Sequence, residues 1–173
     1  MILGKKTQHL LLPVDLRFLW LTLFVALLLN LLPSGRVLWM PDFLLVALAF
    51  WGLHQPRHAG VLVAFVFGLT MDVHRTTLLG MHALAYSAMA YITFLLHRRL
   101  QHFRPHWQAL QMFGLFLGTH ALLWLLRLAT GGHWPGAGLL LAPVIEALLW
   151  PLLDMLLLAP QRRAPDRDLT RPL

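Results

Sequence analysis

The chain has 173 residues, of which 58% are hydrophobic and 12% are charged, and its mean hydropathy is +0.67. Soluble domains carry roughly 25% charged residues, so this composition excludes an ordinary water-soluble globule and a disordered chain. The 14 Lys and Arg residues outnumber the 7 Asp and Glu residues. No basic stretch is long enough for a nucleic-acid-binding module, so the positive charge is assigned to cytoplasmic loops and anionic lipid headgroups. Because the chain has no cysteine, disulfides and thiolate chemistry are excluded.

Six apolar segments predict an all-α integral membrane protein, built as a single bundle of six transmembrane helices over residues 1–160. Each span needs about 20 apolar residues, so six spans use about 120 and leave no room for a separate soluble domain. The predicted spans are 16–32, 37–53, 59–73, 78–97, 107–129 and 138–158. Pro41 is expected in the first turn of the second span, where its missing N–H is harmless. Residues 161–173 are predicted to form a flexible cytoplasmic tail.

The distribution of positive charge predicts how these spans are oriented. With the N-terminus inside, only Arg36, Arg75 and Arg127 fall in loops on the outer side. Cytoplasmic loops are enriched in Lys and Arg, so both termini are predicted to be cytoplasmic. The third span rises only about 22 Å, against a hydrocarbon core of about 30 Å. The short second and third spans must therefore be shielded by neighbouring helices or must thin the bilayer.

Asp72 is the most conspicuous charged residue, because it lies near the outer end of the short third span. A carboxylate at mid-bilayer costs about 2.5–3.5 kcal/mol, so Asp72 is expected to face protein or water. Three interpretations stay open: a helix-end carboxylate paired with Arg75 at headgroup level, a packing or partner-docking role, and proton or ion transfer.

Other ionisable residues indicate contacts between helices rather than chemistry. Glu146 and Asp154 share one face of the sixth span, which Pro143 and Pro151 are expected to interrupt, and their spacing of about 12 Å favours hydrogen bonds to other helices over acid–base work. His120 is likewise expected to bond to another helix. His54 and His58 have metal-ligand spacing, but Pro56 breaks the helix that such a pair needs. The sequence therefore predicts no catalytic residue, no metal site and no cofactor.

Small residues give the clearest packing signal. Gly114 and Gly118 form a GxxxG pattern in the fifth span, which permits close approach of another helix. Gly60 and Gly68 share a face of the third span, and one face of the fourth span carries Gly80, Ala83, Ser87 and Ala90. These faces either pack inside the bundle or bind the transmembrane helix of another protein.

The order of several short motifs over residues 38–158 resembles the MreD family of rod shape-determining proteins. The motifs are Pro41, Phe50-Trp51, Pro56 with Gly60, Gly68-x-x-x-Asp72, Leu79-Gly80 with Ala83-Leu84, Ser87, Ala90-Tyr91, Gln108-Ala109-Leu110 and Leu149-Trp150-Pro151. At position 50 this chain has Phe, where members of the family often have a different aromatic residue such as Tyr, which is a mild departure.

The resemblance implies a non-enzymatic subunit of the bacterial cell-elongation machinery in the inner membrane. The resemblance also implies that the protein works with the bitopic protein MreC, and that the two together are linked to the glycosyltransferase RodA, its partner penicillin-binding transpeptidase and the actin-like MreB. The family's six-helix arrangement also resembles the S-components of energy-coupling-factor transporters, a likeness of fold that does not fix function.

We expect such a subunit to act by presenting a groove. A gap beside the short second and third spans, lined by Gly60, Gly68 and Gly80, would receive a partner helix, with Pro41, Asp72 and Ser87 nearby.

Two other functions stay open. A transporter-like subunit would bind a small hydrophobic or lipid-linked ligand, which requires Asn30, Asp72, His120 and Glu146 to face one another. A lipid-modifying enzyme would use Asp72, His74 and His82, but no coupled base and nucleophile are visible.

Overall fold

The computed structural model describes residues 15–32, 40–132, 136 and 140–159, and this part of the chain is entirely helical with connecting turns. A helix lies in each of the six predicted segments, in the expected order. The helices are α1 (Leu16–Leu31), α2 (Phe43–His54), α3 (Val61–His74), α4 (Met81–Leu100), α5 (Pro105–Ala129) and α6 (Leu141–Leu158). The predicted tail, the turn at residues 33–35 and the start of the sixth span at 138–139 lie outside the described residues.

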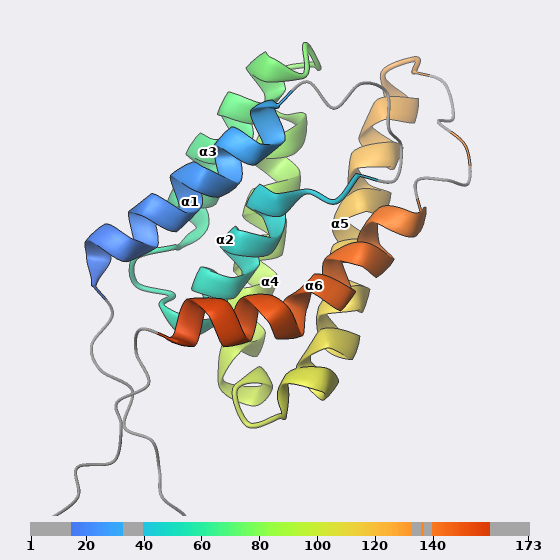
Figure 1. The fold of residues 1–173 in the computed structure, drawn as a ribbon. Helices are drawn as coiled ribbons and strands as arrows, with labels where there is room; N and C mark the ends of the chain where they lie inside the picture. The colour runs from blue at the N-terminus through green and yellow to red at the C-terminus, as the bar shows by residue number, and fades with distance from the viewer. Residues whose placement is uncertain (1–14, 33–39, 133–135, 137–139, 160–173) are drawn as a thin grey trace, which may run out of the picture.

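Helix α2 is the centre of the bundle. It packs against α1, α4 and α6, and α3 joins this group through an extensive contact with α4 (Figure 1). Every residue from Leu44 to Leu53 is buried. A helix of 12 residues rises about 18 Å, too little to span a hydrocarbon core of about 30 Å. Because protein surrounds it, α2 needs no lipid contact, and the expected shielding of this short segment is confirmed.

The longest of the described helices, α5, lies on the side of the bundle away from α1 and α3 (Figure 1). α5 has 25 residues and packs on α4 and α6 (Figure 1). By length and apolar composition, its residues His106–Ala129 and the whole of α6 are able to cross a membrane, whereas α1, α2 and α3 are shorter apolar helices. Pro105 begins α5 at a position where proline is favoured, since the first N–H groups of a helix have no partner inside it.

Two expectations about prolines are wrong, and one helix begins slightly later than expected. Pro41 does not lie in the first turn of α2, because the side chain of Asp42 accepts a hydrogen bond from Leu45 N (2.9 Å) and so caps a helix that begins at Phe43. The fourth helix begins at Met81 rather than at residue 78, because Gly80 has a left-handed φ of 105°. Pro143 and Pro151 do not interrupt α6, which continues through both, the first of them lying in its opening turn.

Helices α3 and α4 approach most closely at Gly68. A Cβ placed on Gly68 would stand 2.6 Å from the backbone N of Ala83 and 2.7 Å from the carbonyl oxygen of His82. No real side chain tolerates such distances to rigid backbone. Glycine at this position is therefore what permits the two helices to touch.

Substitution of Gly68 tests this contact. We expect Gly68→Ala to lower the free energy of unfolding by about 2 kcal/mol, because α3 and α4 must move apart to admit the methyl group. The measurement is thermal unfolding in detergent. Gly114→Ala on α5 is the matched control: a Cβ there meets nothing within 4 Å, so the helix should gain up to about 1 kcal/mol. Equal midpoints for both variants would contradict the close approach.

Candidate functional site

A buried polar network joins five of the six helices, and Asp42 is its central residue. Asp42 is 3% exposed and caps the N-terminus of α2. Its carboxylate also accepts hydrogen bonds from Asn30 Nδ2 on α1 (2.5 Å) and from the Tyr86 hydroxyl on α4. Asn30 returns the contact, since its Oδ1 accepts from Phe43 N at 3.0 Å. One carboxylate therefore fixes α1, α2 and α4 relative to one another.

Glu146 and His120 extend this network to α6 and α5. The backbone N–H of Asp42 donates to Glu146 Oε1 at 2.9 Å, and His120 Nε2 lies 2.9 Å from the same oxygen. This contact between the imidazole and the carboxyl group joins α5 to α6. Glu146 is fully buried and His120 nearly so. The expectation that both residues bond to other helices is confirmed, and a further polar contact across helices places Asp154 Oδ1 3.8 Å from His54 Nε2 of α2.

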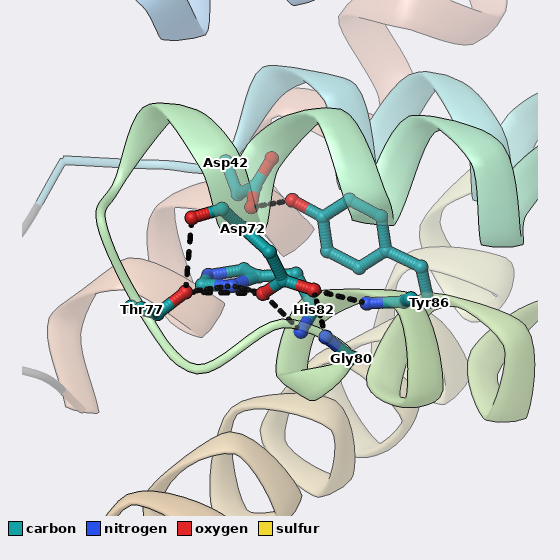
Figure 2. A network of polar contacts seen from close by, with 7 residues as sticks. Asp42, Asp72, Thr77, Gly80, His82 and Tyr86 are labelled. Atoms are coloured by element: carbon teal, nitrogen blue, oxygen red, sulfur yellow. Dashed lines mark hydrogen bonds and ion pairs between the residues drawn. The ribbon is translucent and has the colours of Figure 1, made fainter.

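Asp72 forms a second buried cluster at the turn between α3 and α4 (Figure 2). Its carboxylate accepts the backbone N–H groups of Gly80 (2.8 Å), His82 (2.8 Å) and Ala83 (3.3 Å). These are N–H groups at the start of α4, which have no partner within the helix. A negative charge also interacts favourably with the positive end of the helix dipole. Asp72, on the last turn of α3, thus caps the next helix in the chain.

Side chains complete the Asp72 cluster. Thr77 Oγ1 donates to Asp72 Oδ1 at 3.0 Å, and His82 Nδ1 lies 2.8 Å from the same oxygen (Figure 2). The ring of His82 contacts the ring of Tyr86 edge-on, with centroids 5.9 Å apart, which joins this cluster to the one around Asp42. Asp72 therefore pairs with His82, whereas Arg75 is exposed. Of the three interpretations of Asp72, packing between helices is the one that these contacts support.

The glycines expected to line a groove have three different roles. Gly68 is covered by the backbone of α4, so the expected gap does not exist at that position. Gly80 needs its left-handed φ of 105° to begin α4, and nothing lies within 4 Å of a Cβ there. Gly60 is the N-cap residue of α3, and a Cβ placed on it would stand 3.3 Å from the carbonyl oxygen of Pro56. At Gly68 the small residue therefore serves packing inside the bundle, and whether a partner binds beside the other positions stays a hypothesis.

The remaining sequence candidates lie in separate places. Ala83 and Ala90 are buried on α4. Ser87 is half-buried, and its hydroxyl is the single buried side-chain polar atom without a hydrogen-bond partner in the described part of the chain. Gly114 and Gly118 on α5 have open space around them.

Gln108 and Trp150, both in motifs that carry the family resemblance, contact each other. Trp150 Nε1 donates to Gln108 Oε1 at 3.3 Å, while Gln108 Nε2 donates to Leu100 O at 3.0 Å. This one amide therefore ties the beginning of α5 to the end of α4 and to α6.

Sequence reasoning missed Asp42 and Tyr86. The signal for Asp42 was present, since an aspartate directly before an apolar run is a common N-cap. Nothing in the sequence pointed to Tyr86, whose role depends on a contact with a residue 44 positions away.

The network shows which chemistry the site supports. Thr77 and Asp72 both lie on the Nδ1 side of His82, so the imidazole does not stand between a base and a nucleophile as a catalytic triad requires. Among the described residues, no group of three or more His, Asp or Glu side chains could hold a metal ion. The polar atoms bond chiefly to one another, so the network holds the helices together.

An apolar exterior around buried, mutually bonded polar groups defines a helical membrane protein. A model of the family described as rod shape-determining protein MreD matches residues 14–159. The chain therefore belongs to the MreD family, a family of membrane proteins with a role in determining rod shape. A comparison with solved structures found no match.

Removal of the Asp72 carboxylate is expected to destabilise the bundle. In Asp72→Ala the N–H groups at the start of α4 lose their shared acceptor inside the protein, at a cost of about 3 kcal/mol. Asp15→Ala is the matched control, because Asp15 caps α1 through Arg17 N (3.0 Å) at an exposed position, where the loss should be about 1 kcal/mol. Unfolding by heat or by denaturing detergent gives the comparison. A smaller loss for Asp72→Ala than for Asp15→Ala would contradict the assigned capping role.

Asn30 and Tyr86 should be energetically coupled, because both donate to Asp42. In a double-mutant cycle we expect Asn30→Ala and Tyr86→Phe to be non-additive by about 1 kcal/mol in unfolding free energy. Thr93→Val, combined with Asn30→Ala, supplies the control, since Thr93 bonds only locally to Met89. Strict additivity in the first cycle would mean that Asp42 does not link the two helices.

Proposed function

We propose that this protein is a non-enzymatic subunit of the bacterial cell-elongation complex in the inner membrane, with six spans and both termini cytoplasmic. In this proposal it binds an MreC-like bitopic protein and helps position a RodA-like glycosyltransferase and its penicillin-binding transpeptidase, which build peptidoglycan beside MreB-like filaments. The observation that carries the proposal is membership of the MreD family over residues 14–159.

The buried contacts support a role in assembly rather than in catalysis. Three buried carboxyl groups accept hydrogen bonds from groups of their own chain, those of Asp42, Asp72 and Glu146. Such bonds fix one arrangement of the helices, and a partner that prefers this arrangement would be held in a matching state. Regulation of a synthase needs no chemistry in the subunit, only a difference in affinity for the partner's states.

The transporter-like alternative gains less support. It requires polar side chains that converge on a cavity and remain available to a ligand. Asn30, His120 and Glu146 do converge, but they bond to one another and to Asp42. Asp72 bonds instead within its own cluster at the α3–α4 turn. The likeness to transporter S-components therefore stays a hypothesis about fold.

Native co-purification tests the proposal. The protein, tagged at its C-terminus, is extracted in mild detergent, and the bound proteins are identified by mass spectrometry. We expect an MreC-like protein together with the RodA–transpeptidase pair, and none of these with a tagged multi-pass protein of unrelated function. Recovery of ABC-type ATPases with a coupling subunit would overturn the proposal in favour of the transporter alternative.

A paired variant within the same experiment locates the contact. Gly114→Leu with Gly118→Leu adds bulk on a face of α5 that the chain itself leaves open, beside the exposed amide of Gln111. If the partner helix packs there, recovery of the MreC-like protein should fall several-fold while the thermal unfolding midpoint is not lowered. Full recovery would place the contact on another helix.

A further inference from the structure

The outward face of α3 is built to contact hydrocarbon. Val61, Leu62, Phe65, Val66 and Val73 are exposed, and Leu62 is the most exposed of them at 76%. Thr70 is also exposed, but its hydroxyl donates to the carbonyl oxygen of Val66 at 3.0 Å. The one polar side chain among them thus has its donor satisfied within the helix, as a lipid-facing surface requires. These six residues are called the α3 face below.

The α3 face is much shorter than a bilayer is thick. α3 has 14 residues, which rise about 21 Å, against a hydrocarbon core of about 30 Å. Exposed cationic or polar side chains bound it closely, with Arg57 and His58 before it and His74 and Arg75 after it. The apolar surface therefore cannot continue beyond the helix. Tilting α3 would shorten its projection further and increase the mismatch.

On the opposite side of the bundle, α5 is long enough to cross a bilayer of ordinary thickness. α5 has 25 residues, about 37 Å, and carries exposed apolar side chains such as Leu110 and Leu125. It packs on α4 and α6, whereas α3 packs mainly on α4 and lies near α1, where Phe24 and Phe67 meet edge-on at 5.9 Å. Figure 1 shows α3 and α5 on different sides of the bundle. α2 is even shorter than α3, but it is buried inside the bundle. Of the two short helices α2 and α3, only α3 therefore exposes an apolar face that is shorter than the bilayer is thick.

We propose that the α3 face thins the bilayer locally and selects phospholipids with short acyl chains, whose phosphates meet Arg57 at one end and Arg75 at the other. The inference rests on the multi-pass arrangement of the proposed function. Charge complementarity supports this occupant, because exposed guanidinium groups stand at both ends of the apolar face, where the phosphates of the two leaflets must lie. A face held at both ends cannot slide along the bilayer normal to hide the mismatch.

Site-specific quenching tests the lipid preference of each face. The chain has no cysteine, so a single fluorophore can be attached at Leu62→Cys on α3 or at Leu110→Cys on α5, both highly exposed. The protein is reconstituted in mixtures of dimyristoleoyl and dioleoyl phosphatidylcholine with some phosphatidylglycerol, and brominated analogues of one or the other lipid serve as quenchers. At Leu62 we expect the short-chain lipid to be preferred several-fold. At Leu110 we expect no such preference.

A lengthened face provides the second measurement. His58→Leu with His74→Leu extends the apolar surface at both ends of α3, so the preference at Leu62 should move toward the dioleoyl lipid while that at Leu110 is unchanged. Equal preferences at both positions in the unsubstituted protein would overturn the inference and leave the multi-pass arrangement intact. Absence of quenching at Leu62 by any brominated lipid would overturn it differently, because α3 would then not face lipid. Co-purification with the MreC-like protein tests the proposed function independently of both results.

Discussion

Asp42 is the residue on which the arrangement of the helices depends. A carboxylate removed from water is tolerated only when its oxygens are well supplied with donors, and here the donors come from three helices. The backbone N–H of Asp42 also donates to Glu146, whose side chain is hydrogen-bonded to His120 as well. In a membrane the apolar surfaces of helices gain little by leaving lipid, so such directed bonds and close packing decide which helices are neighbours.

Close packing supplies the other half of the assembly. The contact at Gly68 brings α3 against α4, and the Asp72 carboxylate then reaches the N–H groups that begin α4. The two features need each other: a side chain at Gly68 would separate the helices, and the carboxylate would lose its partners. Gly80 adopts the left-handed conformation that begins α4, which places the first N–H groups of α4 at the Asp72 carboxylate.

The sequence predicted the order and approximate position of the helices that the structure describes, because long apolar runs between polar turns are a strong local signal. It also predicted that His120 and Glu146 bond to other helices and that Asp72 faces protein or water. It could not identify their partners. Asp42 and Glu146 are 104 residues apart, and Asp42 and Tyr86 are 44 apart, so their contacts depend on tertiary packing. The sequence also could not show that Gly68 packs within the chain, since a row of small residues looks the same whether its partner helix is in the same chain or in another.

The central position of α2 explains why the bundle is asymmetric. A helix too short to span the bilayer must be shielded by protein or must thin the bilayer, and the bonds of Asp42 and the packing of α1, α4 and α6 keep α2 shielded. With α2 enclosed, α3 is left at the perimeter, joined mainly to α4 and equally unable to match the bilayer. One solution to a short helix is burial, and the chain uses it for α2. In the proposed membrane arrangement, lipid rather than protein covers the outward face of α3, so the buried network that fixes the fold also determines which of the two short helices meets the lipid.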